Sequence, residues 1–389
     1  MRKNLIVPAG MKDMLPGEAA RKRELESALM AHFSSWGYRE VGTSALEYYD
    51  VVARDGMDPA EVFKLIDREG QILALRPDVT TPIARMTATR LKEETLPLRL
   101  CYTGSTFRYE KVQVGRQREF TQAGVELIGS DSLMADIEVL VMAIEAMELA
   151  GLDSFRMGIG EINVTEGFLK ELLPEEEAAE ARDLIVSKDF VGLEALLGRS
   201  ADPARAEVFL SLVTQNGGAE ILDEIGRYSD RPAYRAAVAG LRTLARVLEE
   251  YGYLNRVFFD FSILRNFRYY TGLVFEGYAG GLGHPVCGGG RYDRLLGSFG
   301  YDAPAVGFAL GLERALLAHG QDRSRENPDI LILGEDYGEI LKTARTLRQE
   351  GSKVEIDLTS VSLEEARQSA DSRGIGRIYV VEGGNGHGK

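Results

Sequence analysis

The sequence predicts an α+β protein made of three parts. Two apolar segments, 98–106 and 119–128, have the composition and loose alternation of strands, and a polar loop between them makes them an antiparallel pair. From 166 to 250 the apolar residues recur with helical period instead. After the polar linker at 320–327, apolar strands alternate with helical segments, which is the pattern of a small α/β module with parallel strands.

The chain before the central pair predicts a helix at 18–36, a strand with a turn within 38–52, and a hairpin formed by 62–66 and 71–75. The second hairpin strand runs into the motif LRPDVTTPIAR, where Pro77 ends the strand and a helix begins near Pro82. Asp78, Thr80 and Thr81 can cap that helix. Asp78 and Thr80 are either caps alone or also a carboxylate and a hydroxyl that face a ligand.

The chain after the central pair predicts a long helix at 132–150 and strands at 256–261 and 269–278. The glycine-rich segment AGGLGHPVCGGGRYD follows, without the GK[ST] or GxGxxG pattern of a phosphate cradle. We therefore interpret the triple glycine before Arg291 as a tight turn with close backbone approach. The segment 305–317 passes from small residues into a helix.

The stretch FRYEKVQVGRQREFTQAGVELIG, residues 107–129, gathers polar side chains between the two central strands. An antiparallel pair places five of them around one pocket: Arg108, Glu110, Arg116, Gln122 and Glu126. The arginines offer donors for a carboxylate or phosphate, and the glutamates offer acceptors for an ammonium or imidazole group. The stretch is either an amino-acid site or a polar hairpin face that carries surface ion pairs.

Charge argues against nucleic acid as a partner. The formal net charge of −14 and the pI near 5.0 repel polyanions. The C-terminal residues 326–389 hold 12 acidic and 8 basic residues, a net charge of −4, so they are no better suited to RNA.

The composition also bounds the cellular setting. The N-terminus has no long apolar segment, and nowhere do 18 apolar residues run together, so we expect a cytoplasmic protein that makes no membrane contact. Cys101 and Cys287 are far apart in sequence and accompany only four histidines. We expect packed thiols in a reducing compartment, with no disulfide, metal site or cofactor.

Three blocks in fixed order carry a family resemblance: LRPDVTTPIAR, then FRYEKVQVGRQREFTQAGVELIG, then RYYTGLVFEGY with GGRYDRLLGSFGYDAPAVGFALGLERAL. Over nearly its whole length the chain resembles the histidyl-tRNA synthetases and, more closely, their paralogues, the regulatory subunits of ATP phosphoribosyltransferase. The resemblance implies a class II synthetase-like antiparallel sheet flanked by helices and usually dimeric, formed by 1–165 and 251–320. It implies a helical insertion at 166–250 and a truncated anticodon-binding-like α/β domain at 326–389.

The resemblance assigns roles toward ATP in the synthetases. Arg108 matches the arginine that contacts the α-phosphate of ATP and the carboxylate of the amino acid, and Glu110 would lie near adenine. Arg265 matches the arginine that stabilises the adenylation transition state in place of a metal. Arg314 matches the third-motif arginine on ATP.

The other matched residues form a histidine-like pocket. Those that resemble the residues holding the ammonium group of histidine are Asp78, Thr80, Gln122 and Glu126, with Arg116 contacting it nearby. Two aromatic residues line the imidazole side, Tyr269 and Tyr270.

Departures from the synthetase pattern favour the regulatory paralogue. LRPDVT replaces LRPEGT, and Glu110-Lys111-Val112-Gln113 replaces ERPQ. Arg268 stands where the synthetase motif RGLDYY has its aspartate, which reverses the local charge; a misplaced charge near a phosphate-handling site can cost several kcal/mol. The last domain is also shorter than in the synthetases, whose further strands and helices grip the anticodon.

The implied function is that of a non-catalytic regulatory subunit in the first step of histidine biosynthesis. It would assemble as a self-dimer within a hetero-oligomer with a short-form ATP phosphoribosyltransferase catalytic subunit, and would take part in allosteric feedback regulation with histidine as its ligand. The alternative is an enzyme, a histidine-tRNA ligase with an abbreviated anticodon domain. A third possibility is a stand-alone amino-acid sensor.

Overall fold

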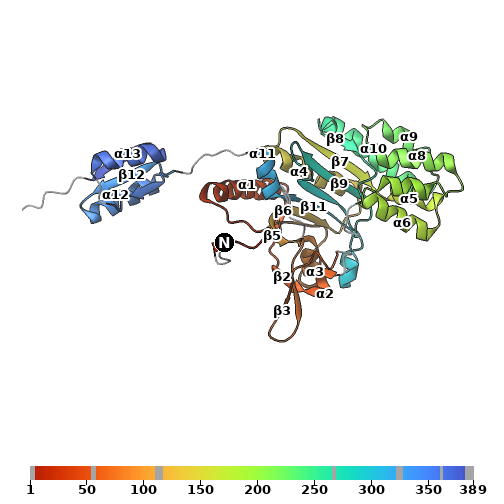
Figure 1. Ribbon diagram of the computed structural model, residues 1–389, viewed down its shortest axis with the longest axis horizontal. Helices are drawn as coiled ribbons and strands as arrows, with labels where there is room; N and C mark the ends of the chain where they lie inside the picture. The colour runs from red at the N-terminus through yellow and green to blue at the C-terminus, as the bar shows by residue number, and fades with distance from the viewer. Residues whose placement is uncertain are drawn as a thin grey trace, which may run out of the picture. The chain divides into compact units, whose positions relative to one another are not determined.

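The computed structural model describes residues 5–53, 58–109, 117–264, 269–320, 327–359 and 362–381. The chain divides into two compact units. Met1–Met14 and Arg21–Gln321 form the larger unit, and Leu15–Ala20 and Asp322–Lys389 form the smaller one. Figure 1 labels many of the helices and strands of both units.

The larger unit is built on one wide sheet, whose strand order in the described residues is β1-β5-β6-β11-β10-β9-β7-β8 (Figure 1). In that order the strands are Arg39–Glu40, Leu98–Phe107, Glu119–Ile128, Ala305–Gly311, Cys287–Arg291, Leu273–Ala279, Phe155–Glu161 and Val257–Phe259. All pairings from β5 to β7 are antiparallel. Only the two edge pairs, β1 with β5 and β7 with β8, are parallel. The α+β class and the antiparallel central pair are therefore confirmed.

Helices from distant parts of the chain cover this sheet: α1 (Pro16–Ser35), α3 (Thr80–Arg90), α4 (Leu133–Leu149) and α11 (Leu312–His319). The most buried is α4, whose residues from Ala135 to Ile144 are all buried. Its apolar composition is that of a helix surrounded by protein on most sides. The hydroxyl of Ser132 caps α4 by accepting a hydrogen bond from the Ala135 amide at 3.3 Å. The expected helices at 18–36 and 132–150 are confirmed.

A second, small sheet has the order β2-β4-β3, from Leu46–Tyr48, Ile72–Leu75 and Lys64–Ile66. The expected hairpin at 62–66 and 71–75 is confirmed by the antiparallel pairing of β3 with β4. The single strand expected within 38–52 is wrong, because β1 and β2 are separate and α2 (Tyr49–Val52) follows. The buried Arg76 guanidinium donates a 2.7 Å hydrogen bond to the carbonyl of Thr43. This bond holds the backbone of the segment that connects β1 to β2.

The helices of the insertion lie between β7 and β8: α5 (Ile162–Leu172), α6 (Glu175–Val186), α7 (Phe190–Leu197), α8 (Pro203–Thr214), α9 (Ile221–Ile225) and α10 (Pro232–Glu250) (Figure 1). Local signals set their starts. Asp202 accepts a hydrogen bond from the Arg205 amide at 3.1 Å, and Pro203 occupies the first turn of α8. That 166–250 and 326–389 are separate domains stays a prediction.

The smaller unit contains the α/β module expected from the alternating tail: β12 (Ile330–Gly334), α12 (Tyr337–Gln349), β13 (Val354–Ile356), α13 (Leu363–Arg373) and β14 (Arg377–Val381). Its sheet has the order β13-β12-β14, and both pairings are parallel as predicted. A capping box between Ser362 and Glu365 begins α13.

The glycine run 288–290 lies inside β10, so the expected tight turn is wrong and only the close approach holds. A Cβ at Gly289 would lie 2.6 Å from the ring of Phe275, which is too close for any side chain. Both cysteines are buried free thiols, as expected. Within the described ranges, no helix is both long and apolar enough to span a bilayer.

Candidate functional site

The candidate site lies on the β5–β6 pair. The register sets Leu100 opposite Glu126 and Gly104 opposite Gln122. Side chains alternate between the two faces of a strand, so Gln122 and Glu126, four residues apart, share one face. The sheet thus fixes the relative positions of these two polar groups.

A cavity of about 30 Å³ opens on this face. It is lined by seven of the ten site residues expected from the sequence: Asp78, Thr80, Arg108, Gln122, Glu126, Tyr269 and Tyr270. The other three, Glu110, Arg116 and Arg265, lie outside the described residues, as do Lys111, Val112 and Arg268. The volume is on the order of one or two water molecules. A free amino acid is larger than this volume.

Glu126 is the most buried carboxyl group in this lining, with a relative exposure of 1%. It is hydrogen-bonded to the Thr80 hydroxyl at 2.7 Å and, through its other oxygen, to the Tyr292 hydroxyl. Burial raises the pKa of Glu126 to about 8 despite these hydrogen bonds, and the charge of Asp78 adds to the rise. This carboxyl is therefore mostly protonated at neutral pH, whereas a cationic ligand would favour its ionised form.

Asp78 combines the two roles that the sequence left open. Its Oδ1 accepts a hydrogen bond from the Thr81 amide at 2.8 Å, which satisfies a donor of the first turn of α3, and its side chain also lines the cavity. Burial raises the pKa of Asp78, although the Thr81 hydrogen bond and the charge of Arg108 oppose the rise. Thr80 is not a cap. It is the first residue of α3, and its hydroxyl donates a hydrogen bond to the Glu126 carboxyl group instead.

Two further polar groups define the rest of the lining. Among the described residues, the side-chain oxygen of Gln122 is buried and meets no hydrogen-bond donor, so it can accept from a ligand. The Nε of Arg108 donates to the Pro77 carbonyl at 2.9 Å, which fixes the side chain near the cavity. The guanidinium groups of Arg108 and Arg314 lie 5.4 and 5.9 Å from the ring centroid of Phe120, so two of the three arginines assigned roles toward ATP border one aromatic ring.

Three tyrosines form the aromatic side of the cavity. The ring centroids of Tyr269 and Tyr270 are 4.8 Å apart, and those of Tyr269 and Tyr292 are 5.6 Å apart. The first pair is tilted and the second is edge-to-face, and such a group of rings attracts a cation as well as a planar ring. The sequence reasoning did not name Tyr292 as a site residue, although it lies in the quoted GGRYD motif. Its contact with Glu126 depends on the packing of distant segments.

Arg291 anchors Tyr292 from behind the cavity. It is 7% exposed, and its Nε donates to Asp136 at 2.9 Å while its Nη1 donates to Asp293 at 3.0 Å and to the Ser130 carbonyl at 3.0 Å. Burial raises the pKa of Asp136 to about 6 and outweighs the attraction of Arg291. The arginine joins α4 to β10 through this network and fixes the backbone on which Tyr292 stands.

Glycines allow the strands and the acid to approach each other. A Cβ at Gly307 would collide with the Glu126 carboxylate, and one at Gly290 would lie 2.9 Å from the ring of Tyr270. Both positions require the absence of a side chain. The small residues at 305–311 thus make room for the pocket, in addition to forming a strand.

The sheet, its covering helices and this acid-and-tyrosine pocket define a class II aminoacyl-tRNA synthetase-like protein, and the family model for histidyl-tRNA synthetase matches residues 10–315. Proteins named ATP phosphoribosyltransferase regulatory subunit are more similar still over their full length. The one from Moorella thermoacetica is 45% identical, with 97% of this chain and 98% of the relative covered. The one from Desulfitobacterium hafniense is 41% identical, with the same coverage. The chain belongs to this family of regulatory subunits.

A solved structure agrees with that assignment. The Bacillus halodurans protein described as an ATP phosphoribosyltransferase regulatory subunit/histidyl-tRNA synthetase superposes with a TM-score of 0.88 at 32% sequence identity. The superposition covers 97% of this chain and 98% of that chain. The class II synthetase-like fold expected from the sequence is therefore confirmed.

Proposed function

We propose that this chain is a non-catalytic regulatory subunit that assembles with a short-form catalytic subunit of ATP phosphoribosyltransferase. The complex carries out the first step of histidine biosynthesis in the cytoplasm. The observation that carries the proposal is 45% identity, over nearly the full length of both chains, to a protein named as such a regulatory subunit.

Sequence departures support a regulatory subunit over a histidine-tRNA ligase. Arg268 replaces the aspartate of the synthetase motif, and Lys111 and Val112 replace its arginine and proline. A cation in place of a carboxylate disturbs the charge balance that adenylation needs. The net charge of −14 further disfavours tRNA binding.

The purified chain is expected to show no histidine-dependent exchange of pyrophosphate into ATP and no charging of tRNA with histidine. Exchange requires all the acidic residues and arginines of the synthetase site. In this chain Arg268 stands in place of one of those acids. The assay is run beside a histidyl-tRNA synthetase as a positive control. Robust exchange together with tRNA charging would establish the ligase alternative and end the regulatory account.

We propose that the cavity is the histidine site of this subunit. Carboxyl groups of Asp78 and Glu126 and the free Gln122 oxygen are acceptors for an ammonium or imidazolium group. The Arg108 guanidinium is a donor for the ligand carboxylate. Because the cavity measures only about 30 Å³, we expect binding to move its lining side chains apart, and that movement is a physical route from ligand to partner. A coupling free energy of roughly 1 to 3 kcal/mol would suffice for feedback inhibition.

We also propose that the subunit is a self-dimer within the hetero-oligomer, with the small sheet at the contact. Pairing of Leu46 with Leu75 and of Leu73 with both Tyr48 and Leu65 puts these five residues on one face. On that face Leu46, Tyr48 and Leu65 are 42%, 59% and 45% exposed. Such a contiguous apolar face is typical of an interaction surface.

Light scattering of the purified chain is expected to give the mass of a dimer, and Tyr48→Asp is expected to give mainly monomer. The buried carboxylate would have no partner at the contact, so association should weaken by at least tenfold. Val191→Asp is the matched control, because Val191 is 79% exposed on α7 of the insertion. A monomeric wild type, or a dimer unaffected by Tyr48→Asp, would contradict this contact.

A further inference from the structure

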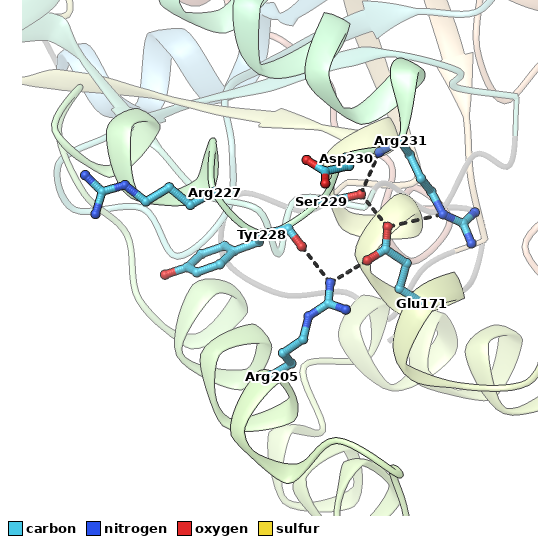
Figure 2. A pocket seen from close by; sticks show the side chains of 7 residues that line it. All are labelled: Glu171, Arg205, Arg227, Tyr228, Ser229, Asp230 and Arg231. Atoms are coloured by element: carbon cyan, nitrogen blue, oxygen red, sulfur yellow. Dashed lines mark hydrogen bonds and ion pairs between the residues drawn. The ribbon is translucent and has the colours of Figure 1, made fainter.

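Two hollows lie side by side on the helical insertion, away from the β5–β6 cavity. The first measures about 470 Å³, and three arginines line it: Arg205, Arg227 and Arg231 (Figure 2). The second, which we call the apolar hollow, measures about 260 Å³, and its apolar side chains, which include Val208 and Ile221, are accompanied by polar ones. Tyr228 lines both, so the two form one continuous surface, which we call the insertion groove.

Glu171 at the end of α5 fixes two of the arginines. Figure 2 shows its carboxylate between Arg205 and Arg231, with Arg231 Nε at 3.2 Å and Arg205 paired to the other oxygen. Burial alone would raise the pKa of Glu171, but hydrogen bonds from Ser229 and Arg205 hold it below its usual value. Arg205 also donates to the Tyr228 carbonyl at 2.6 Å. These two cations are therefore held in place before any partner arrives.

Arg227 has a different role. In the described part of the chain, its exposed guanidinium takes part in no ion pair. Figure 2 shows it extending away from Glu171, on the opposite side of Arg205 from Arg231. Arg205 and Arg231 converge on Glu171, whereas Arg227 points away from it, so the three cations do not share one point. A single phosphate needs converging donors, whereas a row of cations suits acidic groups along an extended segment.

The apolar hollow continues this row along α8. Arg205, Val208 and Leu212 recur at helical spacing, so one face of α8 runs from the cationic hollow into the apolar one. Glu207 and Glu224 border the apolar hollow and would repel acidic groups there. Three arginines outnumber two acids, Glu171 and Asp230, in the first hollow, whereas the charged residues of the second are both acidic, so the groove is polarised in charge.

We propose that the insertion groove binds an amphipathic segment of the catalytic partner subunit. The acidic end of that segment lies over the arginine row, and its apolar side chains enter the hollow beside Val208 and Ile221. The inference rests on the proposed function for the identity of the partner. Charge complementarity selects the acidic end, and the net charge of −14 of the whole chain disfavours a nucleic acid at the same place.

The test measures binding of the full-length chain to the purified short-form catalytic subunit by calorimetry at two salt concentrations. Arg227→Glu reverses a charge in the arginine row, and Val208→Asp places a charge in the apolar hollow. Both changes should weaken binding by about tenfold or more, and the Arg227→Glu loss should shrink at high salt. Arg199→Glu is the matched control, because Arg199 is an exposed cation of the same insertion that lines neither hollow. Circular dichroism confirms that each variant is folded.

Selective weakening by Arg227→Glu and Val208→Asp, with Arg199→Glu unchanged, supports the groove as the docking site. If the wild type binds and both groove variants bind equally well, the groove is not the docking site, while the regulatory function stands. If the wild type does not bind at all, the regulatory function and the docking site both fail. Two other results also overturn the proposal. One is a change in the mass of the chain alone, which assigns the groove to self-association. The other is that the groove variants bind the catalytic subunit as the wild type does but lose affinity for a 20-nucleotide RNA probe.

Discussion

Replacing Glu126 by glutamine is expected to stabilise the unliganded chain at pH 8, raising its free energy of unfolding by roughly 2 to 4 kcal/mol. Glutamine keeps the shape of the side chain, and its amide can hydrogen-bond with the hydroxyls of Thr80 and Tyr292. The substitution removes a carboxyl group that ionises readily in the unfolded chain but not in its buried native position. That difference in ionisation lowers the free energy of unfolding of the wild type at pH 8. The measurement is urea unfolding of both proteins without histidine.

The pH dependence identifies the cause. The pKa of Glu126 rises from 4.5 to about 8 on folding, so the native state holds a proton that the unfolded state releases between these values. The stability contributed by that proton is complete below pH 4.5 and is lost as the pH rises to 8. The gain from Glu126→Gln should therefore be large at pH 8 and small at pH 5. An equal gain at both pH values, or none at pH 8, would contradict a buried, protonated Glu126.

The same substitution is expected to weaken histidine binding by about 1 to 3 kcal/mol, because the ligand cation loses a charged partner. Binding to the wild type should also release a proton near pH 7, as the ligand ionises Glu126. Calorimetry in buffers of different ionisation enthalpy measures both effects. Glu249→Gln, an exposed change on α10, is the control. Equal affinity of the Glu126→Gln protein would place histidine elsewhere.

Replacing Arg291 by methionine is expected to destabilise the chain by about 3 to 5 kcal/mol, because it leaves the buried Asp136 carboxylate without its ion-pair partner. The Ser130 carbonyl loses a donor at the same time. Urea unfolding at pH 7 measures the loss. Methionine fills a similar volume, so the effect isolates charge and hydrogen bonding from packing.

Two further variants separate the causes of that loss. Adding Asp136→Asn to Arg291→Met removes the unpaired charge and should recover part of the stability. Arg246→Met, on the exposed face of α10, should change it by no more than about 0.5 kcal/mol. A stability unchanged by Arg291→Met would mean that the arginine does not hold the segment on which Tyr292 stands.

Local sequence signals predicted the strands and helices that have clear periodicity. The pair 98–107 and 119–128, the hairpin at 64–75 and the helix of α4 carry patterns that suffice by themselves. Strand β10 was missed because its residues Cys287–Arg291 are mostly glycine, which disfavours strands in general. The glycines are there because neighbouring rings and backbones leave no room for a Cβ. That requirement arises only in the assembled sheet, so the sequence of the segment alone does not predict it.

The site was predictable in its residue types and in part in its geometry. Asp78 and the pair Gln122 and Glu126 come from two places in the sequence, and the start of α3 and strand β6 bring them to one cavity. Tyr292 could not be inferred from the residues around it. Only the order β6-β11-β10 brings the end of β10 to within hydrogen-bond reach of Glu126. The hydrogen bond from the Thr80 hydroxyl to Glu126 likewise follows from packing and not from helix capping rules.

The most direct test of the regulatory role is the phosphoribosyltransferase activity of a short-form catalytic subunit, measured with and without this chain. Condensation of ATP with phosphoribosyl pyrophosphate is followed at a fixed concentration of the catalytic subunit, while this chain is added in increasing amounts up to an excess. A regulatory subunit is expected to give little activity without the chain, saturation near an equimolar ratio, and inhibition when histidine is added. Activity that is the same with and without the chain would contradict the account.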